Sequence, residues 1–198
     1  MAKIIDFMKK RKLFSSLVFI LLLGIISSLI FIFLLSDENL GLMKDSISGY
    51  FNSISNNNIN YLNDFIVSVF NNTSIAVIIW LFGISIIGSL FIYVLFFIKS
   101  FTVSLSFISI ISLYGFKGVL ISFVYIIPYI ISLGILFVLS YYSISFSIIL
   151  IKYLFRGFNC NRKVIVNRYV KVLLFCILLL FINSLLDVFL VPRILLLF

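Results

Sequence analysis

Long apolar stretches, separated by single charged residues or short basic runs, dominate the pattern of this chain. One stretch covers residues 13–35, and the region from Ser74 to Gly157 contains only four formal charges, each at a gap between apolar runs or at the end of one. Apolar stretches of about 20 residues are long enough to cross a bilayer as helices. The pattern predicts an all-α, polytopic transmembrane helical bundle with about five spans.

The expected spans cover residues 13–36, 74–98, 100–116, 119–151 and 172–191. Of these, 100–116 is barely long enough to cross, so it either crosses or is re-entrant. The turn after it is marked by Lys117 between Gly115 and Gly118. The next stretch is too long for one upright helix, and Pro128, which has no backbone donor, is expected to kink or break it. The last four spans form one membrane domain, residues 73–198.

Charged residues predict the orientation, because positive residues next to a span stay on the cytoplasmic side. The N-terminal segment 1–12 is strongly basic, and the charged residues of the segment 37–72 are mostly acidic. A second basic loop joins the last two spans; its members are Lys152, Arg156, Arg162, Lys163, Arg168 and Lys171. We therefore expect an N-in/C-out protein whose segment 37–72 lies outside. The first span is expected to remain uncleaved, because no small-residue cleavage site follows it.

The outer segment 37–72 contains apolar residues at helical spacing, in two groups separated by an asparagine run. The groups are Ile47, Tyr50, Phe51 and Ile54, and Leu62, Phe65, Ile66, Val69 and Phe70. They predict two short amphipathic helices, the second capped by Asn60, with apolar faces on the membrane surface or on the outer ends of the bundle. Two interpretations stay open: a partner-binding segment, or a loop folded back onto its own helices.

Composition agrees with membrane lipid as the main solvent of the chain. A mean hydropathy of +1.32 and 64% hydrophobic residues exclude a water-soluble domain of this length. In a soluble protein, the net charge of +9 would suggest that the protein binds nucleic acid. Here membrane topology explains the basic clusters, and no nucleic-acid partner is expected.

The sequence offers little material for catalysis. It has no histidine, and its six carboxylates include no neighbouring pair in the membrane domain. Catalysis by serine would need Lys99 or Lys117 as the base, and no particular serine–lysine pair is singled out. The two cysteines fit neither a metal site nor a redox pair. We therefore expect no catalytic residue, no metal and no cofactor.

Asp187 is the one acidic residue inside an expected span. A charged residue at the centre of a span costs roughly 2.5 to 3.5 kcal/mol on insertion scales. Either Asp187 makes a buried polar contact with another helix of the protein or of a partner, or it lies near enough to the outer surface to meet water or Arg193.

Small residues recur four apart at three places, which allows close helix approach. The pairs are Ser85 and Ser89, Ser100 and Ser104, and Ser143 and Ser147, with Gly83 and Gly88 nearby. We interpret these faces first as packing surfaces within the protein, and second as contacts in a homo-oligomer.

Two stretches carry a recognisable pattern. Residues 80–101 form a glycine-rich span that ends in a lysine, and residues 115–154 begin with a turn that is followed by a proline in the middle of the next span. The residues in these places are Gly83, Gly88, Lys99, Gly118, Ser122, Phe123 and Pro128. The last span ends in an acidic residue followed by a proline, Asp187 and Pro192. In these features the chain resembles the family of stage II sporulation protein M.

The resemblance implies a non-enzymatic scaffold in the bacterial cell membrane. Family members in sporulating bacteria hold two peptidoglycan-degrading partners, the D and P proteins of the same stage, in the mother-cell membrane while it engulfs the forespore. Two other classes of function remain open from the residues. One is the membrane subunit of a transporter or exporter whose basic loop 156–171 docks a cytosolic ATPase, and the other is an intramembrane enzyme.

Overall fold

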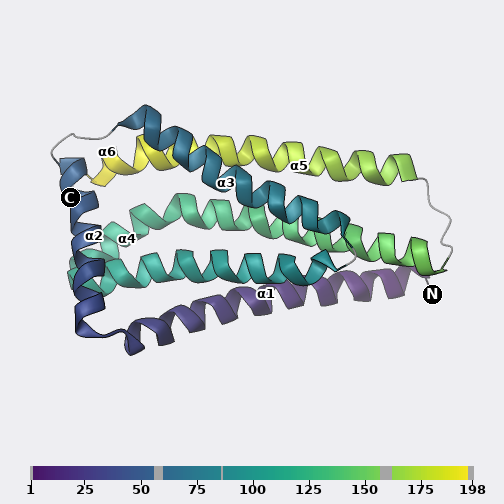
Figure 1. Ribbon diagram of the computed structural model, residues 1–198, viewed down its shortest axis with the longest axis horizontal. Helices are drawn as coiled ribbons and strands as arrows, with labels where there is room; N and C mark the ends of the chain where they lie inside the picture. The colour runs from purple at the N-terminus through teal and green to yellow at the C-terminus, as the bar shows by residue number, and fades with distance from the viewer. Residues whose placement is uncertain (1, 56–59, 86, 157–161, 196–198) are drawn as a thin grey trace.

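The computed structural model describes residues 2–55, 60–85, 87–156 and 162–195. Helices α1 (Ala2–Leu34), α3 (Tyr61–Ile84), α4 (Gly88–Arg156) and α5 (Arg162–Leu185) run along the long axis of the molecule (Figure 1). Helix α2 (Asp37–Ser55) crosses one end of them, and a π-helix η1 (Leu186–Leu190) and α6 (Val191–Leu195) continue α5. Five segments of these described residues are long and apolar enough to span a membrane. The predicted all-α transmembrane bundle is confirmed.

Helix α4 is a hairpin of two spans. Its backbone leaves the helical region at Gly115, where φ is 56° and ψ is −133°. This positive φ strains any residue with a Cβ, which explains a glycine at the turn. Gly118 follows closely, and a Cβ there would lie 2.6 Å from the carbonyl oxygen of Ile110. The predicted turn is confirmed; we call residues 88–116 the first arm and 118–156 the second arm.

The two ends of the bundle differ in charge. The beginning of α1, the last turns of α4 and the beginning of α5 lie at one end, which we call the basic end, and α2 lies at the other, the α2 end (Figure 1). The basic end carries Arg11, Lys12, Lys152, Lys163, Arg168 and Lys171. The α2 end carries the acidic residues Glu38, Asp45 and Asp64. This asymmetry is the one that the sequence led us to expect.

The expected boundaries of the second and third spans are wrong. A helix over 74–98 was expected, but α3 ends at Ile84 and α4 begins at Gly88, with a short break between them. The first arm therefore spans 29 residues rather than starting at Ser100. A break without charge or proline gives no hydropathy signal. Lys99, expected at the end of a span, lies well inside the first arm.

The outer segment is shorter than expected. Helix α3 begins at Tyr61, so residues 61–72 are the first turns of a span and not a separate amphipathic helix. The predicted cap is confirmed, because the Asn60 side chain accepts a hydrogen bond from the Asn63 backbone N–H at 3.3 Å. The predicted first helix is part of α2, whose Ile54 is buried against Val191. Tyr50 and Phe51 have side chains outside the described residues.

Two further expectations differ from the structure. The second arm runs through Pro128 as a continuous helix, so the break expected there is wrong. Its 37 candidate span residues rise about 55 Å, more than the ~30 Å of hydrocarbon, so the arm must tilt or project beyond it. The basic segment expected as a loop before 172–191 is largely helical, because α5 begins at Arg162.

All five spans contribute to one apolar core. Its fully buried members include Leu17 of α1, Ile79 of α3, Phe96 and Leu136 of the two arms of α4, and Leu180 of α5. Many other large apolar side chains, such as Phe19 and Leu22 of α1, are exposed. In a bilayer these exposed side chains face lipid, so the exposed surface and the core are both apolar.

The break before α4 yields a prediction about Gly88. A Cβ at this position would lie 1.7 Å from the carbonyl oxygen of Phe82, so the two helices must move apart to accept a side chain. We expect Gly88→Ala to lower the free energy of unfolding by about 1–3 kcal/mol. The measurement is the thermal unfolding midpoint of the protein in detergent.

The matched control is Gly134, a glycine in the second arm with no atom within 4 Å of its ideal Cβ. Gly134→Ala should raise the stability by about 0.5–1 kcal/mol, because glycine weakens a helix interior. Equal midpoints for the two variants would contradict the close approach at Gly88.

Candidate functional site: a buried polar network between the spans

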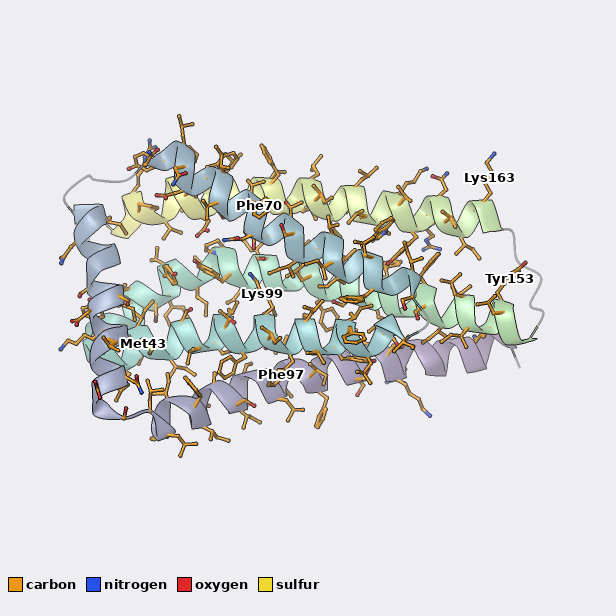
Figure 2. All side chains as sticks on the ribbon, in the orientation of Figure 1. Met43, Phe70, Phe97, Lys99, Tyr153 and Lys163 are labelled. Carbon is orange, nitrogen blue, oxygen red and sulfur yellow. The ribbon has the colours of Figure 1, made fainter. Side chains whose placement is uncertain are left out.

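Asn72 of α3 is the centre of a polar network inside the bundle. Its Oδ1 accepts hydrogen bonds from Lys99 Nζ at 3.4 Å and from the Ser132 hydroxyl at 3.2 Å. Its Nδ2 donates to the hydroxyl of Ser184 at 3.4 Å. Figure 2 shows Lys99 directed into the space between α3 and the first arm. One amide therefore joins α3, both arms of α4 and α5.

Asp187 extends the network towards the α2 end. Its Oδ2 accepts a hydrogen bond from the Ser68 hydroxyl of α3 at 3.1 Å, and its carboxyl group interacts electrostatically with Lys99. Of the two explanations offered by the sequence, the structure therefore supports the contact with another helix. The opposite formal charges of Lys99 and Asp187 lie in one cluster, which reduces the cost of burying either one.

The backbone around Asp187 is widened. Residues 186–190 form a π-helix, in which the Val191 N–H donates to the Leu186 carbonyl five residues earlier. Single π turns inside α-helices are frequent at functional sites. Pro192, buried just after this turn, offers a cause. Its ring would clash with the carbonyl of Val188, four residues earlier, and a wider turn relieves the clash.

A second contact joins α5 to the second arm. Asn183, which is 2% exposed, donates from Nδ2 to the carbonyl of Pro128 at 2.9 Å. Within the described residues, its Oδ1 and the Thr73 hydroxyl are buried without a hydrogen-bond partner. Either oxygen could accept a hydrogen bond from a small polar group.

The structure brings two of the family-resemblance residues, Lys99 and Asp187, into this network. A third, Pro128, accepts the hydrogen bond of Asn183 in the second contact. The others lie elsewhere. Gly88 begins α4 after the break that follows α3, Gly118 lies at the turn between the two arms, and Pro192 follows η1.

Gly83 belongs to a separate contact nearer the basic end. A Cβ on Gly83 would lie 2.1 Å from the hydroxyl oxygen of Tyr169, so only glycine admits this ring. The Tyr169 hydroxyl donates to the carbonyl of Trp80 at 2.7 Å and lies 2.9 Å from the Ser143 hydroxyl. Tyr169 therefore fixes α3 to the second arm and to α5.

Part of the small-residue faces packs within the chain, as expected first. Ser100, Ser143 and Ser147 are at most 1% exposed, whereas Ser85 is exposed and Ser89 and Ser104 are only partly buried. Ser100 donates to the Leu21 carbonyl of α1 at 3.0 Å, opposite Gly24. Ser147 donates to the Ser85 carbonyl at 2.9 Å and so holds the break between α3 and α4.

Sequence reasoning missed most members of the network and of the contact beside it, namely Ser68, Asn72, Ser132, Asn183 and Ser184. The charge pattern placed residues 37–72 in the outer segment, so Asn72 was not expected inside a span. A signal existed, because Ser68 and Asn72 are four residues apart and therefore share one face of a helix. Asn183 and Ser184 likewise lie within one turn of Asp187.

The network joins helices, because each hydrogen bond of Asn72 reaches a different segment of the bundle. In the ranges that the structure describes, no three histidine, cysteine, aspartate or glutamate side chains gather as a metal site would require. The fold and the network define a multi-pass α-helical membrane protein whose spans are connected by buried polar contacts.

A known family matches this chain over nearly its whole length. The family described as SpoIIM, stage II sporulation protein M, matches residues 15–192, and the chain belongs to this family. No curated protein and no solved structure matches the chain. The protein is therefore a multi-pass membrane protein of a sporulation family, and that family is not a known enzyme family.

The central place of Asn72 predicts a large effect of its removal. Asn72→Leu deletes three interhelical hydrogen bonds, each worth about 0.6 kcal/mol in membrane proteins, and should lower the stability by about 2 kcal/mol. The neighbouring Asn71 is exposed, so Asn71→Leu is a matched control with little expected effect. Unfolding in detergent measures both, and similar midpoints would argue against the network.

A double-mutant cycle tests whether Lys99 and Asp187 compensate each other. Lys99→Met leaves the Asp187 carboxylate without its opposite charge, and Asp187→Asn does the converse, so each should destabilise the protein. The double variant removes both charges and should be more stable than additivity predicts, by about 0.5–3 kcal/mol. Strictly additive losses would show that the two groups are independent.

Proposed function

We propose that the protein is a non-enzymatic scaffold of the mother-cell membrane that recruits peptidoglycan-degrading partners, the stage II sporulation D and P proteins, during engulfment of the forespore. The family assignment over residues 15–192 supports this function. The basic end of the bundle would face the cytoplasm and the α2 end the cell wall, because positive residues flanking spans stay inside.

The observation that carries the proposal is the placement of α2 across the ends of the spans (Figure 1). Ile54 is buried against the bundle, and Met43 and Ile47 on the same side of α2 are partly covered. At 100° per residue, Glu38 and Asp45 fall on the opposite side, where both are exposed. The helix thus rests on the bundle by its apolar side and offers an acidic side to the wall compartment, which suits a docking platform.

Deleting the gene should block engulfment and mislocalise both hydrolases. The sharper variant is Asp45→Lys, which reverses a charge on the outward side of α2 without touching the bundle. We expect this variant to reach the membrane at wild-type amounts and to co-purify about tenfold less hydrolase, the effect of a 1.4 kcal/mol loss. Crosslinking in native membranes followed by quantification of both hydrolases measures it.

The matched control is Asp64→Lys, which makes the same reversal at the same end but on α3, where Asp64 is also exposed. It should retain hydrolase binding. Normal engulfment in the deletion strain would refute the scaffold function, and equal recovery with both variants would remove α2 as the platform.

A second candidate function is a transport subunit, favoured by the presence of Lys99 and Asp187 within the spans, since intramembrane ionisable residues often mark ion pathways. The double variant Lys99→Met with Asp187→Asn separates the two. In a scaffold, engulfment should follow the amount of protein in the membrane. Loss of engulfment at wild-type protein levels would favour transport.

A further inference from the structure

A groove lies at the α2 end, apart from the polar network. Its volume is about 410 Å³, within the range of small-molecule sites. One wall is the inner side of α2, with Met43 and Ile47, and the other is the first arm, with Ser106 and Ile110. Tyr125 of the second arm completes it. Figure 2 labels Met43 on α2, at the end of the bundle where the two arms of α4 meet.

The groove has the chemical character of an apolar site. None of its lining residues is charged. The hydroxyls of Ser46, Ser106 and Ser109 donate to carbonyls of their own helices, those of Leu42, Thr102 and Leu105. A polar ligand would find these donors already engaged. The three hydroxyl oxygens can still accept a hydrogen bond, but most of the lining surface is apolar.

The depth of the groove indicates what can fill it. Ile110 precedes the Gly115 turn by five residues and Tyr125 follows Gly118 by seven, which corresponds to about 8–11 Å of helix rise. In a bilayer this is the depth at which the apolar side of a surface helix meets the acyl chains. The space beneath α2 therefore lies beside lipid chains and is only partly closed by Met43 and Ile47.

We propose that this groove binds one acyl chain of a phospholipid from the leaflet that α2 covers. The acyl chain supplies apolar contacts to α2 between Leu40 and Ile54; among the side chains that the structure describes there, Ile54 alone is fully buried against the bundle. The thioether of Met43, 3.8 Å from the Ser109 hydroxyl across the groove, is a flexible wall that adapts to such a chain. The site does not depend on any protein partner.

The test uses the purified full-length protein in nanodiscs of phosphatidylethanolamine and phosphatidylglycerol, with a trace of phosphatidylethanolamine carrying a diazirine in its acyl chain. After illumination, mass spectrometry locates the label. We expect about tenfold more label per residue on the groove walls at Met43 and Ile110 than on Phe19, a lipid-facing residue of α1 that is 61% exposed.

Two variants fill the groove from opposite walls, Ser46→Phe and Ser106→Phe. Each should remove the excess label from the groove walls and leave the label at Phe19 unchanged. Thr102→Phe, an exposed position one turn before Ser106 on the same arm, is the matched control and should keep the wild-type pattern.

Groove labelling no higher than at Phe19 in the wild-type protein would overturn the proposal without any variant. Labelling that both filling variants leave intact would overturn it as well. So would a protein partner crosslinked beneath α2 in cells in place of lipid. None of these results bears on hydrolase recruitment, which is tested separately by the Asp45→Lys variant on the outward side of α2.

Discussion

The arrangement of this bundle depends on one constraint: polar groups between helices in a membrane have no water to meet and must find partners in the protein. Asn72 satisfies that constraint for four segments at once, through Lys99, Ser132 and Ser184. Apolar contacts between spans slide easily, since lipid is as apolar as the helices themselves. The amide is different, because a shift of α3 by one residue would turn Asn72 away from all three partners. It therefore sets the register of the spans.

Close approach of the helices follows from a different set of residues. Gly24 faces Ser100 between α1 and the first arm, and Gly83 admits the ring of Tyr169 between α3 and α5. Packing of this kind supplies the dispersion energy that holds helices together in lipid, where burial of apolar surface gives little net gain. The polar contacts determine the axial register of the spans, and the small residues permit the short distance between them. Neither set alone would determine how the spans pack.

The sequence was sufficient for the features that leave a strong local signal. The number of spans, the Gly115–Gly118 turn, the Asn60 cap and the charge difference between the ends all follow from hydropathy, glycine or charge. It was insufficient at the break after Ile84, which a serine hydroxyl and a tight glycine contact hold without any charge. Lys99 was placed at a span end because a lysine in lipid is costly. Its partners Asn72 and Asp187 come from distant segments, and no single span reveals them.

The position of Asp187 depends on Pro192, which lies five residues further along the chain. Pro192 lacks a backbone N–H, and its ring excludes the usual position of the carbonyl four residues earlier, so the helix widens over Leu186–Leu190. An extra residue in the turn rotates the preceding part of the helix, including Asp187, relative to Val191. That rotation allows Asp187 to face Ser68 and the network while Val191 still packs on Ile54 of α2. The segment Asp187–Val191 thereby contacts both the polar network within the spans and the helix that crosses their ends.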